Sequence, residues 1–235
     1  MEAVDTVEVW TALRTSLLIV LCATALVVAT GLPLAAALAR PGWRGRGLVD
    51  ILVTLPLALP PTVLGFYLLQ LIGRRGPVGW LTQELLGGTL IFTPAAAVLA
   101  AALVGLPLFV QPARAAMEEV PAEVHEAAAI DGATGWAHLR YITLPLARPG
   151  IFTGILLAFT RSLGEFGATL MVAGNIPGRT QTLSLAIYSA VQAGREDLAA
   201  RLALLLTAVA AVSLWAGIRW RRPGRGPAAE RRVWL

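Results

Sequence analysis

Long apolar runs separated by short charged segments form the main pattern along the chain. Residues 17–38, 51–72 and 89–110 contain no charged side chain. A helix needs about 20 consecutive apolar residues to cross the hydrocarbon core of a bilayer, and each of these runs is long enough. The pattern therefore predicts three transmembrane helices.

Two further runs reach a similar length but contain charges. The run 150–173 includes Arg161 and Glu165, and the run 198–218 includes Arg201 near its start. Between them, residues 182–193 are apolar but too few to cross the membrane. We therefore predict an all-α, polytopic membrane helix bundle with about five full spans and a short re-entrant or broken helix at 182–194. The expected spans are 12–38, 48–72, 89–111, 146–173 and 198–219, in a single transmembrane domain over 1–235.

Composition supports a membrane protein and argues against one other class. Hydrophobic residues make up 57% of the chain and charged residues 14%, whereas a soluble domain has about 25% charged residues. The formal net charge is +5, but the arginines flank apolar runs and form no basic face with interleaved aromatic residues. We therefore expect lipid, and no nucleic acid, among the partners of this chain.

The placement of arginines predicts the orientation, because positively charged loops stay on the cytoplasmic side. The loop after the first run contains Arg40, Arg44 and Arg46, and arginines recur at 219, 221, 222, 225, 231 and 232. Both segments should be cytoplasmic, although the arginines at 74 and 75 do not follow the rule. Five spans then place the N-terminus outside and the segment 113–145 in the cytoplasm.

Prolines and glycines interrupt several of the apolar runs. Pro60 and Pro61 lie in the middle of the second run, where a missing amide hydrogen bends a helix and leaves carbonyl groups for neighbours to satisfy. Both a translocation pathway and ordinary packing are consistent with these prolines. Gly150 and Gly154 form a GxxxG pattern, which favours close helix crossing either between subunits or inside one bundle.

The segment 113–145 is too acidic to enter lipid. Its alanines at 127–129 favour a helix without bulk, and Gly132 permits a turn that a side chain would oppose. We expect a short helix, a sharp turn and a second helix along the membrane surface, a knob suited to a cleft on another protein. The stretch HEAAA begins like a zinc motif but has Ala129 where a second histidine is required, so no metal site is expected.

The same segment matches a known motif. A glutamate and two alanines are followed at fixed spacing by a glycine and then by an isoleucine and a leucine-proline pair, which resembles the EAA motif of ABC importer permease subunits. The resemblance implies that 113–145 contains the coupling helix, which docks on a cytoplasmic ATP-binding subunit. The coupling residues that it implies are Glu126, Ala127, Ala128, Asp131, Gly132, Ile142, Leu144 and Pro145.

The resemblance extends beyond the motif. Residues 157–194, which contain LGEFGA and GNIP, and residues 55–69 are similar to the permease family of molybdate importers. Sulfate and thiosulfate permeases share LGEFGA and GNIP in similar form and are the alternative. The resemblance implies import of molybdate, and of tungstate as a similar dianion, across a bacterial cytoplasmic (inner) membrane. It also implies a homodimer and an extracytoplasmic oxyanion-binding protein as partners.

Arg161 and Glu165 lie four residues apart on one face of an expected span. A charge in the middle of a span costs roughly 2.5 to 3.5 kcal/mol on insertion scales, so both must face protein or water. One interpretation is that this face borders the substrate path or its gate, and the other is a self-satisfied pair that fixes the helix in the bundle. The residues assigned to the path or gate are Arg161, Gly164, Glu165, Phe166, Pro60 and Pro61.

The chain contains no lysine and therefore no GxxxxGK[ST] phosphate-binding loop. ATP and magnesium are expected on the partner ATPase subunit, with no cofactor and no enzymatic activity in this chain. A secondary transporter, the main alternative class, would require intramembrane ionisable groups and repeated halves. The sequence shows one clear charged pair and no repeat.

Overall fold

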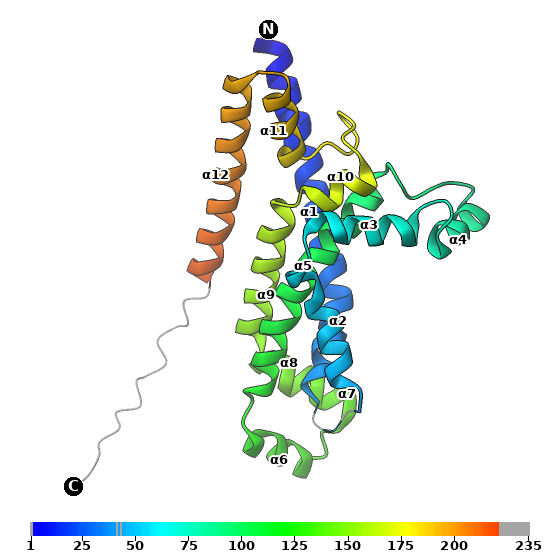
Figure 1. Ribbon diagram of the computed structural model, residues 1–235. Coiled ribbons are helices and arrows are strands. Elements are labelled where there is room, and N and C mark those ends of the chain that lie inside the picture. The colour runs from blue at the N-terminus through cyan, green and yellow to red at the C-terminus, as the bar shows by residue number, and fades with distance from the viewer. Residues whose placement is uncertain (1, 41, 43, 221–235) are drawn as a thin grey trace.

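The computed structural model describes residues 2–40, 42 and 44–220, and every regular element in these ranges is a helix (Figure 1). Side chains are described for the same residues except 2–4, 86 and 220. The helices are α1 (Glu2–Ala39), α2 (Arg46–Ala58), α3 (Pro61–Ile72), α4 (Pro77–Leu86), α5 (Pro94–Glu118), α6 (Ala122–Ile130), α7 (Gly135–His138), the π-helical segment η1 (Leu139–Thr143), α8 (Leu144–Leu146), α9 (Arg148–Leu163), α10 (Gly167–Ala173), α11 (Leu183–Gln192) and α12 (Glu196–Trp220).

The centre of the bundle is α5, which packs between α1 and α9. Small residues line these contacts, and Ala97, Ala100 and Ala113 of α5 are fully buried. Gly154 of α9 lies so close to α5 that an added Cβ would be 2.7 Å from the Phe109 carbonyl oxygen, and Gly150 meets Ala116 in the same way. The GxxxG pattern therefore serves packing inside this chain.

Among the described residues, three helices are long and apolar enough to cross a membrane, namely α1 over Asp5–Ala39, α5 and α12 over Glu196–Arg219. The bent pair Gly135–Leu146 and Arg148–Leu163, with an angle of 73° between its parts, can count as a fourth span. The described residues therefore do not confirm the expectation of five full spans. The expected spans 48–72 and 146–173 are each divided into separate helices.

Both interruptions have a local cause. Leu59 and Pro60 each precede a proline and adopt extended backbone angles, with ψ of 141° at both, which ends α2 and starts α3 at Pro61. In the later span, α9 ends at Leu163 and α10 begins at Gly167, so the break contains the predicted gate residues Gly164, Glu165 and Phe166. The expected span 48–72 therefore breaks at Pro60 and Pro61, and the expected span 146–173 breaks around Glu165.

The two ends of the bundle differ in what they carry. The segment from α6 to α8 caps one end, and the start of α1 lies at the other end beside α11 (Figure 1). α12 packs on α11 and α9 and runs back toward the end that carries α6. The predicted orientation places the coupling segment and the C-terminus on one side of the membrane, and α12 runs toward the end that carries α6. The arginines expected at 221–232 lie outside the described residues.

Candidate coupling and translocation site

The predicted coupling segment folds as a helix, a turn and a second helix. α6 begins after Pro121 and ends in a turn in which Gly132 has a φ of 79°. The Gly132 amide donates to the Ala129 carbonyl at 3.1 Å, and the Ala133 amide donates to the Ala128 carbonyl at 2.8 Å. These two bonds form a Schellman cap, which places its glycine in the left-handed region. Gly132 is therefore required for its backbone conformation, since a Cβ there would meet nothing within 4 Å.

The motif residues divide into an outer and an inner set. The exposed ones are Glu126, Ala127, Asp131 and Gly132, and Ala128 is buried. Ile142, Leu144 and Pro145 are half-buried in η1 and α8, which connect the turn to α9. The outer set can contact another protein, and the inner set joins the loop to the bundle.

Three large apolar side chains of the same segment are also exposed. Ile130 is 87% exposed, Trp136 68% and Tyr141 70%. Exposed apolar clusters of this kind mark sites of contact with other proteins or with lipid. Sequence reasoning did not assign these three residues to the site, and the only signal for them was their apolar character within an otherwise polar segment.

A pair of histidines connects the two arms of this loop. His125 Nδ1 of α6 lies 2.9 Å from His138 Nε2 of α7, with ring centroids 4.8 Å apart. The other nitrogen of His138 lies 3.4 Å from the Thr143 hydroxyl. The hydrogen bond between the rings holds α6 against α7, a role that the sequence did not suggest.

The charged pair in the broken span is confirmed as a contact. Arg161 Nη1 lies 3.0 Å from Glu165 Oε2, and the Glu165 side chain is 2% exposed while that of Arg161 is 33% exposed. The other carboxylate oxygen accepts a 2.8 Å hydrogen bond from the Ala168 amide in the first turn of α10. Glu165 therefore both caps α10 and neutralises the charge of Arg161. One side of the Arg161 guanidinium remains exposed.

The two interrupted spans meet where α3 crosses α10. A Cβ added to Gly167 would lie 3.1 Å from the Cβ of Pro61, and one added to Gly65 would lie 2.9 Å from the Ala168 Cα. Pro61, which sequence analysis assigned to the path, is thus next to the residue that follows Phe166. Pro60 is exposed at the preceding break, and the Phe166 ring packs on Tyr188 with centroids 5.1 Å apart.

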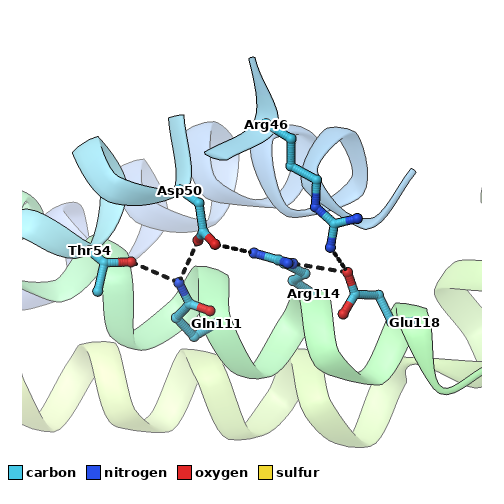
Figure 2. A network of polar contacts seen from close by, with 6 residues as sticks. All are labelled: Arg46, Asp50, Thr54, Gln111, Arg114 and Glu118. Atoms are coloured by element: carbon cyan, nitrogen blue, oxygen red, sulfur yellow. Dashed lines mark hydrogen bonds and ion pairs between the residues drawn. The ribbon is translucent and has the colours of Figure 1, made fainter. Parts of the chain in front are cut away.

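A second polar cluster joins α2 to α5 near the coupling segment (Figure 2). Arg114 Nη1 lies 2.7 Å from Asp50 Oδ2, and Arg114 Nε lies 3.0 Å from Glu118 Oε1. Gln111 Nε2 donates to Asp50 Oδ1 at 3.0 Å and to the Thr54 hydroxyl at 2.9 Å. Arg46 also pairs with Glu118. We call these residues the α2–α5 ladder: Arg46, Asp50, Thr54, Gln111, Arg114 and Glu118.

Sequence reasoning missed the ladder as a unit. Arg46 was used only to predict orientation, and Asp50 was given no role although it lies inside the expected span 48–72. The partners lie far apart in the chain, so no local spacing connects them. A signal was present in the positions 46, 50 and 54 and the positions 111, 114 and 118, because each set falls on one face of a helix.

Comparisons with known proteins found a matching family model and similar sequences. The family model described as "Binding-protein-dependent transport system inner membrane component" matches residues 29–218. The molybdenum transport system permease protein ModB of Escherichia coli (strain K12) is 43% identical over 206 residues, which cover 87% of this chain and 90% of that protein. ModB of Azotobacter vinelandii is 43% identical over 182 residues, which cover 77% of this chain and 80% of that protein.

Solved structures show the same fold at low sequence identity. A chain of the inward-facing MetNI methionine ABC transporter superposes with a TM-score of 0.68 and 20% identity, covering 92% of this chain and 94% of that one. A chain of a bacterial alginate ABC transporter, solved with an alginate-bound periplasmic protein, has a TM-score of 0.69 and 20% identity and covers 90% and 77%.

Proposed function

This chain belongs to the family of binding-protein-dependent transport system inner membrane components, and we propose that it is the permease subunit of an ATP-driven molybdate importer. The observation that carries the substrate is the 43% identity with molybdenum transport permeases over most of the chain. ATP hydrolysis takes place in a separate subunit, and this chain supplies the route through the inner membrane. Tungstate, a tetrahedral dianion of nearly equal size, is expected to follow the same route.

The loop from α6 to η1 is the part of the chain proposed to follow the ATPase. Exposed Ile130, Trp136 and Tyr141 can fill a groove on that subunit. The small side chain of Ala127 lets the backbone of the ATPase subunit approach α6 closely. The exposed carboxylate of Glu126 adds a charged contact at the edge. When ATP draws two ATPase subunits together, the loop moves with them and the membrane helices change between inward and outward access.

The Arg161–Glu165 pair is proposed to border the substrate path. The exposed side of the guanidinium supplies a local positive potential. The buried carboxylate fixes the position of the guanidinium and makes the pair as a whole neutral. A site that must also release its anion requires weak attraction, because conduction stops when binding is too strong. The α3–α10 crossing beside the pair, with Pro60, Pro61, Gly164 and Phe166 at its breaks, is the proposed gate.

The proposed importer has two protein partners in addition to the ATPase. A second copy of the chain would enclose the path on a two-fold axis, and an oxyanion-binding protein would dock at the end of the bundle that carries α11. The outward apolar side chains of α12, among them Leu204, Val212 and Trp215, fit contact with lipid or with the second copy. The structural likeness to importers with a periplasmic protein supports this assembly.

Competition for uptake tests the proposed substrate. The complex of this chain with its ATPase is reconstituted in liposomes with the binding protein outside, and uptake of radiolabelled molybdate is measured against unlabelled tungstate and sulfate. We expect tungstate to compete as well as molybdate, and equimolar sulfate to compete weakly. Equal competition by sulfate would instead identify a sulfate or thiosulfate permease.

A further inference from the structure

The α2–α5 ladder attaches α2 to α5 through polar side chains. The apolar contact of α2 with the core is small, since Val53 is buried and Val49 packs partly buried against the same core, while Leu48, Ile51, Leu52, Leu55 and Leu57 are all exposed. The polar partners of the ladder add to this contact over about two turns of each helix.

This kind of attachment fixes the register of the two helices. The contacts are charge-assisted and directional, so a shift of α2 along α5 would separate Asp50 from both Gln111 and Arg114. The Arg114 side chain is only 16% exposed, which limits the screening of its ion pair by water. An apolar contact of the same area would tolerate sliding more easily, because it has no directional partners.

The ladder also lies between the two sites described above. Glu118 is the last residue of α5, and α6 begins at Ala122 a few residues later. At the other end, α2 leads through Leu59 and Pro60 into α3, which crosses α10. A continuous path of bonded elements therefore connects the ATPase-facing loop to the proposed gate.

We propose that the α2–α5 ladder is a rigid link that carries the movement of α6 to α2 and α3, and that α2 and α5 stay joined throughout the transport cycle. Asp50 and Arg114 are its central positioning residues. This inference rests on the proposed function, since it assigns the ladder a part in ATP-coupled import. A contact that serves only folding would be needed for assembly alone, and a latch would have to open during each cycle.

Removal of the central pair tests the link against a folding role. The double variant Asp50→Ala with Arg114→Ala deletes the ion pair and leaves neither charge without its partner. The complex should still assemble and hydrolyse ATP, while molybdate taken up per ATP falls roughly two- to thirtyfold, the range expected when a coupling network is disrupted. The matched control is Arg44→Ala with Glu119→Ala, which also removes one positive and one negative charge. Both residues are exposed and lie close in sequence to the ladder but are not part of it.

A covalent link tests the rigid link against a latch. Cysteines replace Thr54 and Gln111, whose side chains are hydrogen bonded, in a background where exposed Cys22 is serine. A short bifunctional thiol reagent then joins α2 to α5, and the same protein without reagent is the reference. Uptake should stay within about twofold of the reference, because the two helices do not need to separate.

The outcomes separate this inference from the proposed function. An unchanged ratio of uptake to ATP hydrolysis in the alanine double variant would overturn the link, and so would loss of uptake on cross-linking while ATP hydrolysis continues. If the alanine variant fails to assemble, the cross-linked protein still tests whether α2 and α5 stay joined: uptake within about twofold of the reference supports this, and loss of uptake overturns the link. Failure of the unmodified complex to take up molybdate would contradict the proposed function itself and would appear before any variant is made.

Discussion

Gly167 of α10 lies directly against Pro61 of α3, so that a Cβ added to the glycine would be 3.1 Å from the proline Cβ. The contact joins the two broken spans at the start of the second helix of each. Free backbone groups at a break are costly in a membrane unless neighbours satisfy them. Here the Glu165 carboxylate accepts from the Ala168 amide at the start of α10. The breaks are thus built into one packed unit.

The first prediction concerns the close approach of α3 to α10. In Gly65→Ala, the new Cβ would meet the Met171 Cβ at 2.8 Å and the Ala168 Cα at 2.9 Å, and backbone cannot yield without moving α10. We expect a loss of about 1 to 3 kcal/mol in the free energy of unfolding, which thermal unfolding in detergent measures. Gly47→Ala is the control, because its Cβ would meet nothing within 4 Å in α2. Equal stability of the two variants would contradict the crossing.

A second prediction separates conformation from bulk at the coupling turn. The φ of 79° at Gly132 strains a β-branched residue, whereas asparagine visits this region more readily. Gly132→Val should therefore open the cap of α6 and reduce the ATPase that copurifies with the chain, while Gly132→Asn should retain most of it. Membrane insertion should be normal in both, because the turn lies outside the spans. Normal copurification of the valine variant would remove the turn from the docking surface.

Much of the site could be predicted from sequence, because its signals are local. The segment from Glu126 to Pro145 was predicted as a helix, a turn and a second helix, and Gly132 was predicted as its turn, as the structure has them. Pro60 and Pro61 predicted a bend in the second expected span, but no break was expected at Gly164, Glu165 and Phe166. What local signals could not give is the pairing of these breaks, since Pro61 and Gly167 are brought together only by the packing of α3 and α10 on α5.

The breaks within the expected spans were missed for a related reason. Hydropathy counts apolar residues, and 48–72 remains apolar whether or not the helix continues through Leu59 and Pro60. The backbone geometry imposed by two consecutive prolines is stronger than the apolar length. The α2–α5 ladder was missed because its ion pairs join residues such as Asp50 and Arg114, which no periodicity within one helix connects.

The hydrogen bond between His125 and His138, which we call the histidine clamp, gives a third prediction. His125→Phe keeps a flat ring of similar size but removes the hydrogen bond to His138, which is worth about 0.5 to 1.5 kcal/mol. Hydrogen exchange of the α6 amides should then accelerate roughly two- to tenfold in the chain without ATPase. Thr143→Val is the control, because it leaves the bond between the two rings intact. Unaltered exchange in the His125 variant would mean that the clamp does not hold the loop.

The fourth prediction distinguishes a path role of Arg161 from a packing role. Arg161→Gln leaves the buried Glu165 without its cation, and loss of one partner of a buried pair typically costs about 3 to 5 kcal/mol. The double variant with Glu165→Gln has no unpaired charge, and its glutamine oxygen can still accept from the Ala168 amide. We expect the double variant to recover assembly and ATP hydrolysis but to import molybdate more slowly than the unmodified complex. Full uptake would show that the pair only packs.

The most direct test of the whole account is ATP-driven accumulation of molybdate by the reconstituted complex. Liposomes contain this chain and its ATPase, with ATP enclosed on the side of α6 and molybdate-loaded binding protein on the side of α11. The account predicts that molybdate accumulates inside with ATP and not with ADP, and that Glu126→Lys in the exposed part of the coupling helix abolishes most of this uptake. Accumulation that does not depend on ATP, or ATP hydrolysis without any molybdate uptake in the unmodified complex, would contradict it.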